Sequence, residues 1–92
     1  MNEPMVETLR AAISGALDAQ TVEVIDEGKM HVGHSGEGEG HFRVRVVSSV
    51  FEGQMPIKRH RMVYGAVETW LNQGIHALAI EALTPQEAAS RT

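Results

Sequence analysis

Five histidines are the side chains of this chain best suited to bind a metal or to move a proton near neutral pH. His31 and His34 lie in the glycine- and glutamate-rich segment EGKMHVGHSGEGEG, residues 27–40, and His41 follows it directly. The chain has no cysteine, so it cannot form a disulfide or bind a metal through its own thiolates. Loops of this length are usually functional or mobile.

A fourth histidine, His76, stands among small and branched apolar residues in the stretch GIHALAIEAL, residues 74–83. Strand alternation predicts that the side chain of His76 lies on the same face of the strand as Leu78, Ile80 and Ala82, at the edge of the expected apolar face. The residues alone favour a structural histidine that hydrogen-bonds near the end of the preceding helix, where a partial positive charge is favourable. The alternative is a metal ligand at a strand end.

The segment KRHR, residues 58–61, is the most basic part of the chain and lies where a helix is expected to begin. Backbone amides at a helix start attract anions. Lys58, Arg59 and Arg61, together with Arg43 and Arg45 on an outer strand face, could neutralise about five phosphates. Against nucleic-acid binding stand the net charge of −4 and the absence of a recognisable reading helix. The alternatives are a solvated basic face or one that docks an acidic protein.

Catalytic motifs are absent from the sequence. It contains no HExxH spacing, no nucleophile elbow and no phosphate-binding loop. Tyr64 and Trp70 lie on the helix that carries an apolar stripe, where aromatic residues more often pack than catalyse. We therefore expect a protein that is not an enzyme. No secretory signal and no apolar run of the roughly 20 residues that span a bilayer are visible, so we expect a cytoplasmic protein without membrane contact.

Apolar periodicity and turn residues define the elements that must position these side chains. In chain order they predict a helix at about 3–18, strands at 21–26 and 41–47, a helix whose apolar stripe spans 62–71 and which stops at Gly74, a strand at 75–83, and a short final helix that begins at Pro85 with Thr84 as its cap.

The order of these elements predicts an α+β fold in one domain, residues 1–92. The first two strands are expected to form an antiparallel hairpin, and a helical crossover makes the second and third strands parallel. The predicted architecture is therefore α-β-β-α-β, a three-stranded mixed sheet covered by helices on one face.

Three blocks in this order resemble the BolA-like family, and the resemblance extends from about Val22 to Glu87. They are VIDEG before the histidine- and glycine-rich loop, HFRVRVVSSVFEG followed by RHRMVYGAV, and GIHALAIEALTPQE. The resemblance implies a BolA-like fold related to class II KH domains. It also implies partnership with a monothiol glutaredoxin, often with a shared [2Fe-2S] cluster, and in some members a role in transcription control.

The resemblance also implies an iron ligand at His76. Family members place a second ligand, cysteine or histidine, in the loop between the first two strands, and this chain has only histidine to offer there. We favour His34 because it is nearer the middle of the loop, with His31 close behind and His41 less favoured. Two imidazoles on one iron raise the potential of a cluster. The glutaredoxin cysteine and a glutathione would supply the remaining ligands.

The expected function is therefore a non-enzymatic adaptor of iron–sulfur metabolism that shares a [2Fe-2S] cluster with a monothiol glutaredoxin. We expect the isolated apo protein to carry no cluster and to be a monomer or weak dimer. The alternative function is a DNA-binding transcriptional regulator that uses the basic face around Arg59 and Arg61.

Overall fold

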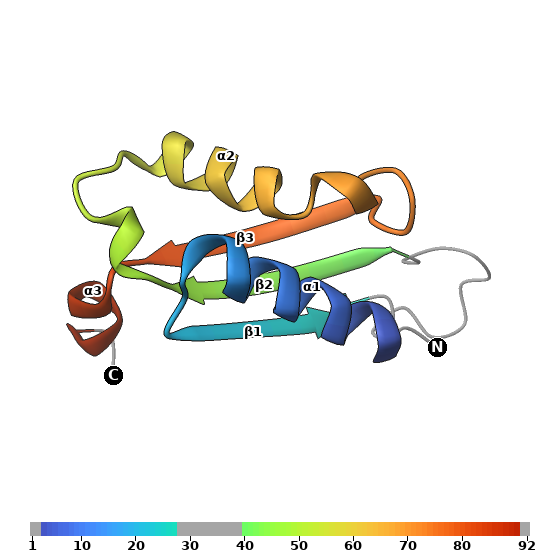
Figure 1. The fold of residues 1–92 in the computed structure, drawn as a ribbon, viewed down its shortest axis with the longest axis horizontal. Helices are drawn as coiled ribbons and strands as arrows, with labels where there is room; N and C mark the ends of the chain where they lie inside the picture. Colours follow the sequence, from blue (N-terminus) through green and yellow to red (C-terminus); the bar gives the residue numbers. More distant parts are fainter. Residues whose placement is uncertain (1–2, 28–39, 91–92) are drawn as a thin grey trace.

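A computed structural model of the protein describes residues 3–27 and 40–90. Its elements, shown in Figure 1, are α1 (Glu3–Leu17), β1 (Thr21–Asp26), β2 (His41–Val47), the 3-10 turn η2 (Ser49–Phe51), α2 (Pro56–Ala66), the 3-10 turn η3 (Glu68–Trp70), β3 (Ala77–Leu83) and α3 (Pro85–Ser90).

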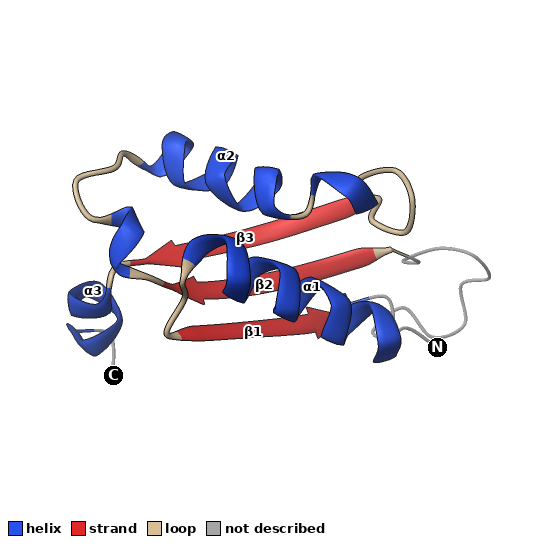
Figure 2. Ribbon diagram, in the orientation of Figure 1, coloured by secondary structure: helices blue, strands red, loops and turns tan. Residues whose placement is uncertain are grey.

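The three strands form one sheet in the order β1-β2-β3. β1 pairs antiparallel with β2 and β2 pairs parallel with β3, with Val44 opposite Val24 on one side and Ile80 on the other. Helices α1 and α2 lie on the same face of this sheet, and α3 lies beyond its end (Figure 2). The predicted α+β architecture, including the mixed pairing of the strands, is confirmed.

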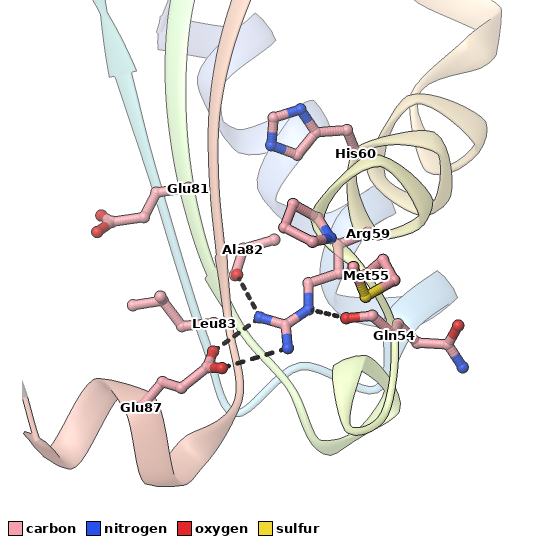
Figure 3. A pocket seen from close by; sticks show the side chains of 9 residues that line it. Gln54, Met55, Arg59, His60, Glu81, Ala82, Leu83 and Glu87 are labelled. Atoms are coloured by element: carbon pink, nitrogen blue, oxygen red, sulfur yellow. Dashed lines mark hydrogen bonds and ion pairs between the residues drawn. The ribbon is translucent and has the colours of Figure 1, made fainter.

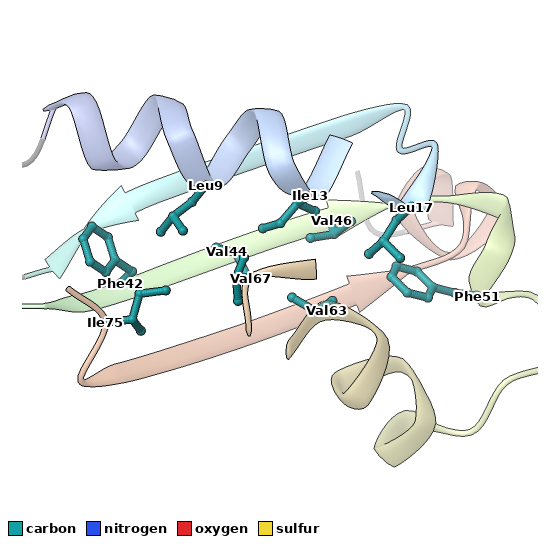
Figure 4. Close-up of a cluster of buried hydrophobic side chains, with 10 residues drawn as sticks. All are labelled: Leu9, Ile13, Leu17, Phe42, Val44, Val46, Phe51, Val63, Val67 and Ile75. Atoms are coloured by element: carbon teal, nitrogen blue, oxygen red, sulfur yellow. The ribbon is translucent and has the colours of Figure 1, made fainter. Parts of the chain in front are cut away.

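Ten buried side chains from α1, α2, β2 and the turns that connect the elements form the core (Figure 4). They are Leu9, Ile13, Leu17, Phe42, Val44, Val46, Phe51, Val63, Val67 and Ile75. The spacing of four residues along α1 places its three members on one face of the helix. Alternation along β2 turns its three members toward the helices, and full burial of each such side chain contributes about 1.5–3 kcal/mol.

The predicted second helix is wrong at its C-terminal end. α2 stops at Ala66, and Val67 has φ −117° and ψ 17°, so its N–H bonds back to Tyr64 and Gly65. The apolar stripe continues because Val67 is still fully buried, but the backbone past it forms the 3-10 turn η3. A glycine in the last turn and a β-branched residue after it both favour an early end to the helix.

The turn between η3 and β3 also differs from the prediction. Gly74 was expected to end a helix, but it lies in this turn, with φ 122°, beside Asn72 with φ 66°. Both the Ile75 and the Gln73 N–H groups donate to the carbonyl of Trp70, which closes the turn. β3 therefore begins at Ala77, and His76 precedes it.

Candidate functional site

His76 is exposed and stands directly before β3, at the end of the sheet where β2 also begins. Its backbone N–H donates to the carbonyl of Gly40 at 2.8 Å, and the Ala77 N–H donates to the same oxygen at 3.2 Å. Gly40 is buried and immediately precedes β2. The backbone on either side of the imidazole is therefore tied to the start of the central strand.

The imidazole of His76 makes no hydrogen bond or ion pair within the residues that the structure describes. Its Cδ2 atom lies close to Gly40, since a β-carbon built on that glycine would be 2.7 Å away. The sequence alone favours a structural histidine whose ring hydrogen-bonds near the end of the preceding helix. Residues 3–27 and 40–90 contain no such hydrogen bond. None of the described residues therefore occupies either ring nitrogen, and both can bind an external partner.

The other predicted metal ligands cannot be compared with His76 in the same way. His31 and His34 lie outside the described residues, in the segment 28–39 that joins the end of β1 to Gly40. His41 is the first residue of β2 and pairs with Ala77, so alternation puts it on the side of Arg43. The described part of the chain contains no cluster of three or more His, Asp or Glu side chains that could hold a metal.

Arg59, predicted to contact phosphate, is largely buried in a network of its own (Figure 3). Its Nε donates to the Gln54 carbonyl at 2.8 Å, and its Nη1 donates to the Ala82 carbonyl at 3.1 Å. Nη1 and Nη2 donate to the two carboxylate oxygens of Glu87 at 2.7 and 3.3 Å. The side chain is 13% exposed, and its guanidinium lies 6.0 Å from the centre of the Phe51 ring. Arg59 therefore joins α2, the end of β3 and α3.

Glu87 completes this network from the other side. Its backbone N–H donates to the Thr84 hydroxyl at 3.1 Å, and its carboxylate accepts from the Thr84 N–H at 3.0 Å. This reciprocal pair is a capping box, and it confirms Thr84 as the cap of the final helix. The pattern T-x-x-E signals the box in the sequence. The bidentate pairing with Arg59, 28 residues away, has no sequence signal.

A hollow of about 450 Å³ lies beside this network, between α2 and the C-terminal end of β3 (Figure 3). Its lining residues are Gln54, Met55, Pro56, Arg59, His60, Glu81, Ala82, Leu83 and Glu87. It is formed at the opposite end of β3 from His76, so the hollow and the histidine are separate features.

Two more predicted phosphate contacts are paired with carboxylates. Arg43 donates to Glu27 at 2.8 Å, and Arg45 lies 3.3 Å from Glu81 across β2 and β3. Lys58 and Arg61 are exposed on α2 and form no ion pair within the described residues. The structure thus leaves two of the five predicted cations without a carboxylate partner in this part of the chain.

Comparison with known proteins agrees with the fold. The sequence profile described as "BolA-like protein" matches residues 13–87. BolA-like protein 1 of Mus musculus is 43% identical over 84 residues, which span 91% of this chain and 61% of that protein. "DNA-binding transcriptional regulator BolA" of Vibrio cholerae is 38% identical over 81 residues, 88% of this chain and 76% of the relative.

Solved structures give the same result. The solution structure of the Mus musculus BolA1 protein superposes with a TM-score of 0.81 at 41% identity, covering 96% of this chain and 71% of that one. The BolA domain of SufE1 from Arabidopsis thaliana superposes with a TM-score of 0.78 at 40% identity, covering 90% and 94%. With its profile match, these relatives and its α-β-β-α-β-α order, the chain belongs to the BolA-like family.

Proposed function

We propose that this protein is an adaptor of iron–sulfur metabolism that binds a monothiol glutaredoxin and shares a [2Fe-2S] cluster with it. One observation carries the proposal: His76 presents an exposed imidazole, without a bond to any described residue, from a backbone fixed by Gly40. Neutral imidazole is a good ligand for iron. The cluster would be cargo that passes through the complex.

The position of His76 also suits a site shared with the loop. His34 precedes Gly40 by six residues. A fully extended stretch of that length spans about 20 Å, so covalent reach permits His34 to share an iron with His76. His31 is the alternative second ligand. The glutaredoxin cysteine and glutathione would complete the set, in keeping with a chain that has no cysteine.

Reconstitution tests this function. The protein is mixed with an apo monothiol glutaredoxin, iron, sulfide and glutathione, and the products are separated by size-exclusion chromatography. We expect a heterodimer whose visible spectrum differs from that of the glutaredoxin homodimer, because imidazole has replaced thiolate on one iron. Recovery of the glutaredoxin homodimer alone, with its own spectrum, would contradict the proposal.

A second candidate function is DNA binding. It is supported by the exposed cations Lys58 and Arg61 on α2, and by the relative of Vibrio cholerae that is named a DNA-binding regulator. The engagement of Arg43, Arg45 and Arg59 by carboxylates weakens it, because each paired cation has less charge to offer a phosphate.

A further inference from the structure

The imidazole of His76 packs against Gly40, where a side chain would otherwise lie. Gly40 has φ 75°, in the left-handed region that favours glycine. A β-carbon at this position would lie 2.7 Å from Cδ2 of His76, 2.7 Å from the Gly74 carbonyl oxygen and 3.0 Å from the His76 nitrogen. Real β-carbons essentially never approach other atoms to within 3.0 Å. Any side chain here must therefore displace both the imidazole and the carbonyl of the turn before it.

The backbone around His76 has little freedom to give way. The Gly40 carbonyl accepts from the N–H groups of His76 and Ala77, which fixes the peptides on both sides of the histidine. The preceding turn lies against α1, because a β-carbon on Gly74 would be 2.7 Å from the terminal methyl of Met5. The side-chain torsions of His76 are thus its main remaining freedom.

We propose that Gly40 is a positioning residue for His76. Because Gly40 has no side chain, the imidazole can pack against its backbone. The Gly40 carbonyl also accepts hydrogen bonds from the peptides on both sides of His76. A ligand already held in one orientation loses less freedom when it binds. The orientation of the ring is a property of the apo protein, whereas its effect on a cluster rests on the proposed function.

The chain offers a matched control for Gly40→Ala. Gly53 has φ 77°, nearly the same as Gly40, but a β-carbon there meets nothing within 4 Å. Alanine therefore carries the same left-handed backbone penalty at both positions, and only Gly40→Ala collides with the histidine. Differences between the two variants therefore report the close contacts of Gly40 with His76 and with the Gly74 carbonyl, and not the left-handed strain.

NMR of the apo protein gives the direct readout. In the wild type we expect an NOE between the His76 Hδ2 proton and the Gly40 α-protons, and a single χ1 rotamer from scalar couplings. Gly40→Ala should shift the imidazole resonances and weaken this NOE, while Gly53→Ala should leave both unchanged. Rotamer averaging in the wild type, or an unaltered imidazole in Gly40→Ala, would overturn the proposal. The wild-type measurement decides it even where Gly40→Ala fails to fold.

The heterodimer then tests the consequence. Changing groups that orient a metal ligand commonly lowers affinity tenfold or more. We therefore expect the cluster of the Gly40→Ala complex to be lost about tenfold faster than that of the Gly53→Ala complex. Equal lifetimes in the two complexes would contradict this consequence. A cluster indifferent to His76→Ala would instead refute the ligand role, and the apo NMR result would stand on its own.

Discussion

At the scale of single residues, exposure and hydrogen bonding separate two side chains that the sequence presents alike. His76 and Arg59 both lie in blocks that resemble the family. His76 is predicted to bind iron, and Arg59 is predicted to contact phosphate. His76 is exposed, and its imidazole is unbonded within the described residues. Arg59 is 13% exposed and makes four hydrogen bonds to the carbonyls of Gln54 and Ala82 and the carboxylate of Glu87. The first side chain is available for a ligand, and the second stabilises the fold.

Replacing Arg59 should therefore reduce stability. Arg59→Met keeps most of the apolar stem over Phe51 but removes every hydrogen bond of the guanidinium. Since hydrogen bonds to charged groups contribute about 1.5–3 kcal/mol, we expect the free energy of unfolding in urea to fall by about that amount. Arg61→Met, on the exposed part of α2, should change it by less than about 0.5 kcal/mol. Equal effects of the two substitutions would show that the Arg59 network contributes little.

At the scale of elements, the first two strands could be predicted to the residue, the third begins two residues later than predicted, and the second helix ends earlier than predicted. Phe42, Val44 and Val46 alternate with arginines, and alternation of this kind fixes both the strand and its buried face. In the second helix the apolar spacing continues past Ala66, although the backbone changes to a 3-10 turn. Apolar periodicity indicates which side chains are buried. It does not indicate which carbonyl each backbone N–H bonds to, and that bond distinguishes an α-helix from a 3-10 turn.

The candidate site shows the same division. The sequence indicates His76 and the loop histidines as ligands only through the resemblance to the BolA-like family, because the residues alone favour a structural role for His76. It does not indicate the support of His76 by Gly40, or the pairing of Arg59 with Glu87. These contacts join residues 36 and 28 positions apart, and only the packing of the whole chain brings them together.

Helix α1 carries a glycine that allows a test at this scale. Gly15 lies in the last third of the helix, and a β-carbon there would meet nothing within 4 Å. Because alanine loses less backbone freedom than glycine on folding, we expect Gly15→Ala to raise the free energy of unfolding by about 0.5–1 kcal/mol. Gly53→Ala should lower it, since the backbone there is left-handed. A decrease for Gly15→Ala in urea denaturation would mean that α1 does not extend through this residue.

At the scale of the whole molecule, charge and size limit the partners. The chain carries a net charge of −4, and its described arginines are largely paired with carboxylates. No helix in residues 3–27 or 40–90 is long and apolar enough to cross a membrane. That the protein is not an enzyme stays a prediction from its motifs. The negative net charge and the paired arginines disfavour a nucleic acid as partner.

DNA binding, if it occurs, should depend weakly on salt. Five phosphate contacts would give a slope of about −4.5 in a plot of log K against log salt, whereas two contacts give about −2. We expect the smaller value, with Lys58 and Arg61 as the two cations, and we expect the Lys58→Glu, Arg61→Glu double variant to abolish binding. Fluorescence anisotropy with a labelled duplex measures both. A slope near −4.5, or binding that survives the double reversal, would mean that other cations make the contacts.

The central claim is that His76 binds the shared cluster, and the most direct test is the visible spectrum and lifetime of the cluster in the heterodimer. His76→Ala is compared with His60→Ala, which removes an exposed histidine from α2, beside the hollow at the far end of β3. Both variants should unfold near the wild-type temperature, because both side chains are exposed. We predict that His76→Ala loses the heterodimer spectrum or reverts to the glutaredoxin homodimer form, while His60→Ala matches the wild type. A His76→Ala complex with the wild-type spectrum and cluster lifetime would contradict the account.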